Sequence, residues 1–495
     1  MIEGGEVDEA IELVVSLLGR MADKQDRLLL QLLKLRKHRF GRRSEKLSEQ
    51  LMLLFEELEG EALTADIELP RPDPKPRSEK KRPPEDLKVV ETEVEPSEEE
   101  KACECGKGRK VIGHESSRVL EYIPGHFEWH VTLRPKLACN RCEAGIVVPE
   151  GPAKVIDRGL PGPGLLAEVV VRKYADHLPL HRLRGIFRRD GVDLPVSTLT
   201  DWVGQATDVL HPVAERLRWK VAGAHVLQMD ATGLRVLDRD SPKGSRKGTL
   251  WGQVGDEKLV AFHYRPGESK EDVAQILAGR EGWVQMDAAP VFDHAFKNGS
   301  NAVRAGCWAH ARRKYVDLTD SRAELMLLHI RDLYRVEREA RDRELSWEER
   351  LALRQERAPP ILEKVKELAR KIVETEPPKN AIADAASYTL KHWDELTHFL
   401  EDGRLKLDNN DCERALRTVA IGRKNYLFAG SDTGGERAAD LYTLLGTARL
   451  AGVDPRAWLR DVLVKIAAGW KASRIDELLP HAWVETQTEA IDAAA

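Results

Sequence analysis

Short apolar runs bounded by turn residues recur in the middle of the chain and predict the strands of one sheet. Two of these runs flank Gly255-Asp256 and predict a hairpin. The first run is expected to bend at Thr232-Gly233, which leaves Asp230 near the tip of a buried strand. The five candidate strands are AHVLQMDATGLRVL (224–237), TLWGQVGD (249–256), EKLVAFHYRPG (257–267), GWVQMDAAP (282–290) and RAGCWAHARRKYV (304–316).

Helical patterns separate the later strands. SKEDVAQILAGR (269–280) is amphipathic, and Ser269 stands three residues before Asp272, close to a capping box. A second helix-sized segment precedes the fifth strand candidate. This order is that of a ribonuclease-H-like core, in which the first and fourth strands are neighbours, so Asp230 and Asp287 are expected to meet. A lone buried carboxylate is unfavourable, so Asp230 is expected to be paired or to hold a metal.

The N-terminal pattern is different, because apolar residues there alternate spacings of three and four and form a heptad seam. The seam predicts a coiled coil through which the chain self-associates, or an amphipathic helix packed on its own domain. A basic stretch, KLRKHRFGRRSEK (34–46), follows and predicts contact with DNA phosphates or a solvated face. The seam positions are Ile11, Val14, Leu18, Met21, Gln25, Leu28, Leu32 and Leu35, and the basic stretch includes Arg39, Arg42 and Arg43.

Composition shifts divide the chain into six expected regions. Residues 61–100 are rich in proline and charge, cannot bury enough apolar surface to fold, and are expected to be a disordered linker. The other regions are 1–60 (coiled coil and basic helices), 101–150 (a β segment with two cysteine pairs), 151–222 (a helix-turn-helix-like region), 223–435 (the ribonuclease-H-like core, with a helical insertion at about 317–400) and 436–495 (C-terminal helices).

Two of these regions carry recognisable helical patterns. LPLHRLRGIFRRDGVDLPVSTLTDWVGQA (178–206) predicts a helix, a break and a second helix capped by Ser197. Four arginines lie nearby, so the pair contacts DNA or has a purely structural role. Residues 317–386 are highly charged and are expected to be mostly helical.

Four of the six cysteines form two tight pairs, Cys103/Cys105 and Cys139/Cys142, with β-like sequence between them. This spacing predicts a closed, structural four-thiolate zinc site rather than disulfides. His114, His126 or His130 is an alternative ligand for one cysteine, and four free buried thiols are the alternative to zinc.

Overall composition narrows the class of protein. The chain has 495 residues and 42% hydrophobic residues, which supports globular cores. No apolar run approaches the roughly 18 residues that span a bilayer, and the acidic N-terminus lacks a signal-peptide core, so a cytoplasmic location is expected. The net charge of −5 argues against nucleic acid, but positive charge is concentrated locally, and local charge matters more for DNA.

The densest polar stretch, LKLDNNDCERALRTVAIGRKNYLFAGSDTGG (405–435), supplies a third carboxylate, Glu413. Asn409-Asn410 is expected to cap a helix that begins near Asp411. The simplest alternative is structural, because Asn410 and Glu413 have capping-box spacing and Glu413 with Arg417 has ion-pair spacing. Positive charge beside this acid comes from Arg414, Arg417, Arg423 and Lys424.

Together these residues resemble the DDE transposases of the bacterial insertion-sequence-sixty-six family. The similarity runs in the family's order from about residue 10 to about residue 470. It rests on HRFGRRSEKL, DVLHPVAERL, HVLQMDATGLRV, GCWAHARRKYV and, above all, CERALRTVAIGRKNYLFAGSDTGGERAA.

The resemblance implies a DNA transposase that binds the ends of an insertion sequence and catalyses metal-dependent strand cleavage and strand transfer. The family's three acids fall on Asp230, Asp287 and Glu413, which would hold two Mg²⁺ or Mn²⁺ ions. Arg312, Arg313 and Lys314 would neutralise the phosphate backbone. His310 positions a phosphate or, as is commoner for a histidine, is a satisfied core residue.

The expected partners are the element's terminal repeats, target DNA, a second copy of the chain through the zipper and small proteins of the same element, with no membrane and a nucleoid-associated location. The chain departs from the family at Ala231, where an acid is usual, at Asp287-Ala288-Ala289, where Asp-Gly-Tyr is usual, and at Ala102, where the first cysteine ligand is usual. The alternatives are a catalytically inactive transposase-derived DNA-binding protein, a metal-dependent nuclease of the same fold, and a pure interaction scaffold.

Overall fold

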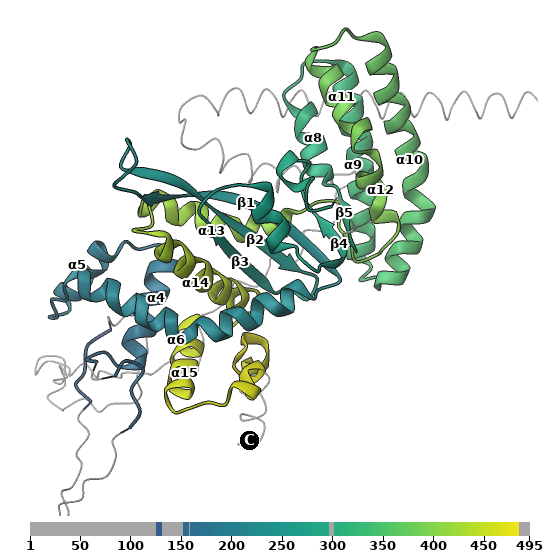
Figure 1. Cartoon of the computed structure of the whole chain (residues 1–495). Helices are drawn as coiled ribbons and strands as arrows, with labels where there is room; N and C mark the ends of the chain where they lie inside the picture. The colour runs from purple at the N-terminus through teal and green to yellow at the C-terminus, as the bar shows by residue number, and fades with distance from the viewer. Residues whose placement is uncertain (1–124, 131–151, 158, 297–300, 485–495) are drawn as a thin grey trace, which may run out of the picture. The chain divides into compact units, whose positions relative to one another are not determined.

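The computed structural model describes residues 125–130, 152–157, 159–296 and 301–484, all of them in the unit formed by Gly125–Ala495. This unit is built on a five-stranded mixed sheet with the strand order β3-β2-β1-β4-β5 (Figure 1). Strands β1, β2 and β3 are antiparallel, whereas β4 and β5 run parallel to β1. The strands are β1 (Val226–Leu237), β2 (Ser245–Gly255), β3 (Val260–Arg265), β4 (Glu281–Gln285) and β5 (Asn301–Ala305).

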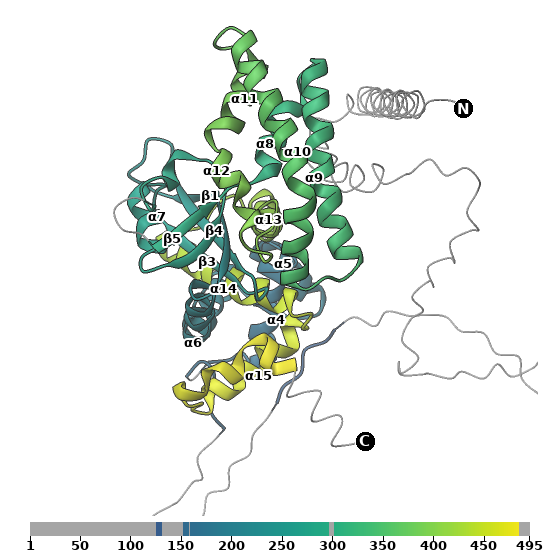
Figure 2. The same cartoon turned by 90° about the vertical axis from the view of Figure 1, so that its right-hand side faces the viewer.

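Helices surround the sheet and form a second core beside it (Figures 1 and 2). The described α-helices are α4 (Pro163–Tyr174), α5 (Leu180–Arg189), α6 (Val196–Ala222), α7 (Lys270–Ile276), α8 (Trp308–Val316), α9 (Ser321–Asp342), α10 (Trp347–Thr375), α11 (Ala381–Lys391), α12 (Trp393–Thr397), α13 (Asn410–Asn425), α14 (Asp432–Leu450) and α15 (Pro455–Ala467). Short 3₁₀ helices are η2 (Pro290–Phe292), η3 (His398–Leu400) and η4 (Ala472–Leu478).

Three parts of the sequence-based prediction for the sheet are confirmed. The first and fourth strands are neighbours, with Gln228 opposite Gln285. β2 and β3 form the expected hairpin, closed by a hydrogen bond of 3.0 Å from the Lys258 amide to the Gly255 carbonyl. α7 follows with a complete capping box, in which the side chains of Ser269 and Asp272 each accept a bond from the other's backbone amide.

β1 does not bend at Thr232-Gly233, so that prediction is wrong. Both residues pair with β2, and the strand continues to Leu237. The residues beyond the expected bend alternate between buried and exposed positions, which is the pattern of a strand with one face on the core. Asp230 therefore lies inside a 12-residue strand rather than at its tip.

The predicted fifth strand, 304–316, is also wrong for most of its length. β5 ends at Ala305, and α8 occupies the rest of the segment. Trp308, Ala311 and Tyr315 are fully buried at spacings of three and four, which is the period of a helix. Between β4 and β5, the described residues contain only the 3₁₀ helix η2 in place of the expected helix.

α13 and α14 cover the face of the sheet that carries Asp230. The Cys412 thiol of α13 donates to the carbonyl of Gly252, the β2 residue paired with Asp230, at 3.2 Å. Neighbouring residues in a strand face opposite sides, and on the other side Phe292 of η2 lies edge-on to Trp251 with ring centroids 5.7 Å apart. The face that carries Asp230 is therefore the one on which residues of β1 and α13 can form a common site.

Helices α8 to α12 form the second core beside β4 and β5 (Figure 2). α9 and α10 lie along each other, and their buried residues include Met326, Ile330, Val365 and Ile372. The helical character predicted for residues 317–386 is confirmed. This helical insertion separates β5 from α13 in the chain.

The helix pair predicted in residues 178–206 is present as α5 and α6, but Ser197 does not cap the second helix. α6 begins after Pro195, whose side chain accepts no hydrogen bond, and runs for 27 residues. Gly191 in the break has φ +89°, a left-handed conformation that suits glycine. Beyond the pair, Arg218 near the end of α6 donates to the Phe262 carbonyl of edge strand β3 at 2.8 Å.

The C-terminal part is helical as well. Trp458 of α15 is fully buried, and its indole N–H donates to the Leu478 carbonyl of η4 at 2.9 Å. Within the described ranges, no helix combines the length and apolar character needed to cross a membrane.

Candidate active site

Asp230 and Asp287 occupy corresponding positions on two neighbouring parallel strands. β1 and β4 pair with Gln228 opposite Gln285, and each glutamine precedes one of the aspartates by two residues. Residues two apart in a strand face the same side of the sheet, so the register places the aspartates next to each other. Asp287 lies just past the end of β4, where its Oδ1 accepts a bond of 3.2 Å from the Ala289 amide.

α13 brings Glu413 to the same place. The amide of Cys412, the preceding residue, donates to Gln228 Oε1 at 3.1 Å, which fixes the start of the helix to β1. Asn409 occupies the N-cap position but makes no side-chain cap bond, and Asp408 Oδ1 accepts from the Asn410 amide at 3.2 Å instead. The structural alternative of an Asn410–Glu413 capping box is therefore wrong, because Glu413 lies one residue too far into the helix.

α8 places two basic groups beside Glu413. Arg313 Nη2 lies 3.5 Å from Glu413 Oε2, and His310 Nε2 lies 3.9 Å from Glu413 Oε1. His310 is not the satisfied core histidine that was expected, since its Nδ1 is buried without a hydrogen-bond partner among the described residues. Burial and the neighbouring Arg313 lower the pKa of His310, so it is neutral at pH 7.

The three carboxylates interact electrostatically. The pKa of Asp230 is raised to about 7, mainly by burial and also by the charges of Asp287 and Glu413, although a hydrogen bond from the Ala231 amide and the charge of Arg313 lower it. Like charges that raise one another's proton affinity must lie close together in a poorly solvated place. Asp230 therefore holds its proton up to about pH 7 when no cation is bound.

This donor set fits a hard divalent cation, because Mg²⁺ and Mn²⁺ prefer carboxylate oxygens and offset the repulsion between them. The three carboxylates are not all within 4.8 Å of one another, the spacing that a single ion would impose on the ligand atoms. A pair of ions, rather than a single one, would be held by acids that stand farther apart.

Within the described residues, a tighter group of ligand-type side chains lies elsewhere, at His211 and Glu215 of α6 and Asp440 of α14. His211 Nδ1 is 2.9 Å from Asp440 Oδ2. Arg218 already neutralises this group, since its guanidinium lies 2.5 Å from Glu215 Oε1 and 2.7 Å from Asp440 Oδ1. The group is therefore an internal ion-pair network, not a candidate for a metal.

The described basic residues that are expected to bind DNA fall into two sets. Arg312, Arg313 and Lys314 lie on α8, and Lys314 stacks over the Tyr388 ring at 5.2 Å. The second set lies on α13, where Arg414 pairs with Asp411, Arg423 donates to Thr232 Oγ1 at 2.9 Å, and Arg417 and Lys424 accompany them. Each set includes a residue next to a carboxylate, since Arg313 is close to Glu413 in space and Arg414 follows Glu413 in the chain.

The sequence interpretation missed the two glutamines. Gln228 Nε2 donates to Gln285 Oε1 at 3.3 Å and to the Asp408 carbonyl at 3.0 Å, so it joins β1, β4 and the segment before α13. A signal was present, because Gln-Met-Asp occurs twice, at 228–230 and 285–287. Such a repeat on two neighbouring parallel strands indicates two equivalent supports for the aspartates.

Other predicted site residues lie outside the described ranges. These are the cysteines Cys103, Cys105, Cys139 and Cys142, the alternative ligand His114, the heptad seam, and the basic residues Arg39, Arg42 and Arg43. His126 and His130 are described, and both bond to Glu128, at 2.7 and 3.3 Å.

Comparison with known proteins identifies the family. The model of the Transposase IS66 family matches residues 158–437, which is more than half of the chain and contains all three carboxylates. The chain belongs to the IS66 transposase family. Three further models of the same group match around it: the IS66 C-terminal element at 443–481, the zinc-finger binding domain of transposase IS66 at 100–143, and Transposase C of IS166 homeodomain, the family's leucine-zipper segment, at 27–92.

Relatives from one bacterium are similar along most of their length. The uncharacterized proteins y4qI, y4hP and y4jD of Sinorhizobium fredii (strain NBRC 101917 / NGR234) are 36%, 34% and 34% identical to this chain. The matches cover 90%, 94% and 82% of the chain and 87%, 90% and 82% of those proteins. The IS66 resemblance seen in the sequence motifs is thus confirmed, as are its leucine-zipper and zinc-finger segments, and family membership implies a transposase.

Proposed function

We propose that this IS66 family member is a DNA transposase that cleaves the ends of its element and joins them to target DNA. In this proposal, the core is ribonuclease-H-like, and Asp230, Asp287 and Glu413 hold two Mg²⁺ or Mn²⁺ ions. The strand order β3-β2-β1-β4-β5, with β4 and β5 parallel to β1, supports such a core.

One observation carries the proposal: β1, the end of β4 and the start of α13 bring three acids to one face of the sheet, where burial, together with the charges of Asp287 and Glu413, raises the pKa of Asp230 to about 7. The acids come from segments far apart in the chain, in a protein of a transposase family. Perturbed carboxylates that converge from separate elements are typical of a functional site.

The chemistry divides between the metal and the side chains. When bound, the ions would supply the positive charge that activates a water molecule or a DNA 3′-hydroxyl and stabilises the leaving oxygen. Asp230 would give up its proton to hold them, because only the ionised carboxylate is a good ligand. Arg313, 3.5 Å from Glu413, would face the scissile phosphate. His310 is neutral and would therefore add no positive charge that repels the metal ions.

The departure at Ala231 does not weaken this proposal. Neighbouring residues in a strand face opposite sides, so the position 231 side chain is directed away from the face shared by Asp230 and α13. An acid there would not face the other two carboxylates, and the Ala231 amide still donates to Asp230 Oδ1 at 2.7 Å.

The remaining segments fit a protein that brings two DNA ends together. We propose structural Zn²⁺ in the zinc-finger segment, with Cys103, Cys105, Cys139 and Cys142 as ligands, and a homo-oligomer formed through the leucine zipper. DNA would contact the basic residues of α8 and α13. Small proteins of the same element and a location at the bacterial nucleoid complete the proposal.

The decisive experiment compares the parent with Asp230→Asn on DNA that carries the element's ends, with and without Mg²⁺. We expect the parent to cleave and join only with the metal, and the variant to lose both activities. Glu268→Gln is the control, since this surface acid pairs with Lys247 away from the three carboxylates and should leave both activities unchanged.

The same assay separates the alternatives. Cleavage without joining by the parent identifies a nuclease, and parent protein that binds the ends without cleaving them identifies an inactive transposase relic. Undiminished cleavage and joining by Asp230→Asn would refute the proposed site.

A further inference from the structure

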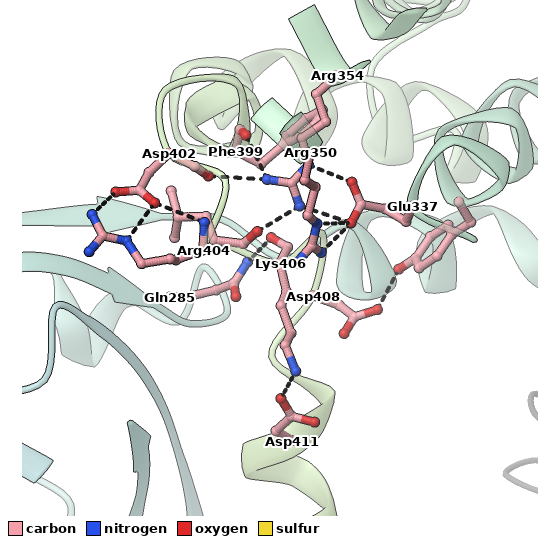
Figure 3. A network of polar contacts seen from close by, with 12 residues as sticks. Gln285, Glu337, Arg350, Arg354, Phe399, Asp402, Arg404, Lys406, Asp408 and Asp411 are labelled. Carbon is pink, nitrogen blue, oxygen red and sulfur yellow. Dashed lines mark hydrogen bonds and ion pairs between the residues drawn. The ribbon is translucent and has the colours of Figure 1, made fainter. Parts of the chain in front are cut away.

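The segment between the helical insertion and α13, residues 399–409, is held from two sides (Figure 3). It has no regular structure over most of its length, yet it determines where α13 begins and so where Glu413 lies. A segment of this kind keeps one conformation only when its backbone polar groups have fixed partners.

Arg354 of α10 supplies these partners on the insertion side. Its side chain is fully buried, and it donates to the carbonyls of Phe399, Asp402 and Leu405 at 3.0, 3.1 and 2.7 Å. Its two other N–H groups donate to the Glu337 carboxylate at 2.6 and 2.8 Å. A guanidinium has five N–H donors in a rigid plane, and all five are used here.

The sheet holds the segment from the other side. Gln285 Nε2 donates to the Lys406 carbonyl at 2.6 Å, and Gln228 Nε2 donates to the Asp408 carbonyl at 3.0 Å. The Trp308 amide of α8 donates to the Leu407 carbonyl between them at 2.8 Å. The glutamines stand two residues before the aspartates, so the segment is tied directly to the strands that carry the other two acids.

A second side chain of the insertion acts closer to the helix. The Tyr334 hydroxyl of α9 donates to Asp408 Oδ2 at 2.9 Å, while Asp408 Oδ1 accepts from the first amide of α13. The insertion therefore contacts the segment at both ends, at Phe399 and at Asp408.

We propose that Arg354 is a positioning residue for Glu413, and that the helical insertion thereby sets the geometry of the carboxylate site. This inference rests on the proposed function, because it assumes that Glu413 is a metal ligand. Arg354 acts through the segment from Phe399 to Asp408 and touches none of the three acids.

The test measures Mn²⁺ binding by electron paramagnetic resonance on the zinc-loaded full chain without DNA. We expect Arg354→Gln and Arg354→Lys to weaken Mn²⁺ binding about tenfold or more, the effect of losing support around a metal ligand. Lysine keeps the charge beside Glu337 but has three donors on a flexible stem, so it cannot hold three carbonyls and a carboxylate together.

Arg350→Gln is the matched control. Arg350 is also on α10 and pairs with the same Glu337, and all of its side-chain bonds within the described part of the chain go to that carboxylate. We expect Mn²⁺ affinity within about twofold of the parent, because the segment keeps its contacts. Parent-like affinity in Arg354→Lys, or equal losses in Arg350→Gln and Arg354→Gln, would overturn the proposal, since charge or general stability would then explain the effect.

Tyr334→Phe covers the case in which the Arg354 variants do not fold. It removes one hydrogen bond to Asp408 and should weaken Mn²⁺ binding about threefold to tenfold, whereas unchanged affinity would count against positioning by the insertion.

Hydrogen exchange separates failure of this inference from failure of the proposed function. Arg354→Gln should exchange faster than the parent and Arg350→Gln in peptides that cover 405–416, and this result does not depend on metal. A parent that binds no Mn²⁺ would refute the proposed metal site, while unchanged exchange in Arg354→Gln would refute the positioning role.

Discussion

Two groups of side chains in this protein contain acids of the type that can bind a metal, but the groups differ in the cations that balance their charge. In the first group, Glu215 and Asp440 lie on either side of Arg218, whose guanidinium contacts both carboxylates. In the second group, Arg313 lies 3.5 Å from Glu413 and its charge lowers the pKa of Asp230, yet burial and the charges of Asp287 and Glu413 still raise that pKa to about 7.

The comparison shows that close spacing of acids does not by itself indicate a metal site. The first group is the tighter one, with ligand atoms within 4.8 Å of one another, but a fixed cation already occupies the position that a metal would take. The second group is looser, and burial and like charges raise the pKa of Asp230 although Arg313 lies nearby. An unfavourable charge balance, rather than proximity, is the property that favours a divalent ion.

The largest difference between the groups should appear in catalysis. We expect Glu413→Gln to lower the rate of DNA cleavage at least about a thousandfold, roughly 4 kcal/mol in the activation barrier. Glu215→Gln makes the same chemical change in the first group and should alter the rate less than about threefold. Single-turnover cleavage of labelled end DNA measures both, and equal losses would show that the two groups do not differ in function.

The next largest effect should be on stability, in the first group. Arg218→Met leaves a buried carboxylate, Asp440, without its guanidinium, and should lower the free energy of unfolding by about 3 kcal/mol. Arg437→Gln removes a more exposed pair with Asp208 and should cost less than about 1 kcal/mol. Urea denaturation gives both values, and a small loss for Arg218→Met would mean that this group needs no internal cation.

In the second group, removing a charged side chain should instead increase the stability of the folded protein. The folded pKa of Asp230, about 7, lies above its ordinary value of 3.8, so the folded protein retains a proton that the unfolded chain releases. The stability from this proton is complete below about pH 4 and is lost as the pH rises to about 7.

Without metal, Asp230→Asn should therefore be more stable than the parent at pH 8, by up to roughly 4 kcal/mol, and the advantage should disappear near pH 4. Millimolar Mg²⁺ should stabilise the parent alone and reduce the gap. Urea denaturation at several pH values measures the difference, and a variant less stable than the parent at pH 8 would contradict the assigned charge balance.

The smallest effect concerns the cation at the edge of the second group. Arg313→Gln should weaken binding of end DNA about fivefold and reduce the salt dependence of the association constant by about one unit of slope, as expected for one lost phosphate contact. Fluorescence anisotropy at several salt concentrations tests this. An unchanged slope would mean that Arg313 serves only to balance Glu413.

Much of the fold could be predicted from local patterns. The apolar runs predicted the first four strands, and the spacing of Ser269 and Asp272 predicted the start of α7, because both signals lie within a few residues. One error occurred where two periods compete. Residues 304–316 are apolar enough to resemble a strand, but Trp308, Ala311 and Tyr315 follow the helical period.

The candidate site likewise contains residues that the sequence identified and one that it could not identify. The three acids stood out because each follows an apolar run or begins a polar helix, and the family resemblance gave them their order. Arg354 could not be recognised, because its role arises from three backbone carbonyls about 50 residues later in the chain. An arginine in a charged helix gives no sign that it will be fully buried.

The shared metal site is tested most directly by the protons released when Mn²⁺ binds. Titration calorimetry of the zinc-loaded full chain in buffers of different ionisation enthalpy measures this number. With Asp230 protonated below pH 7, binding should release about one proton at pH 6 and almost none at pH 8.5, and Asp230→Asn should release none. Binding that releases no proton at pH 6, or the same release in Asp230→Asn, would contradict a cation held by Asp230, Asp287 and Glu413.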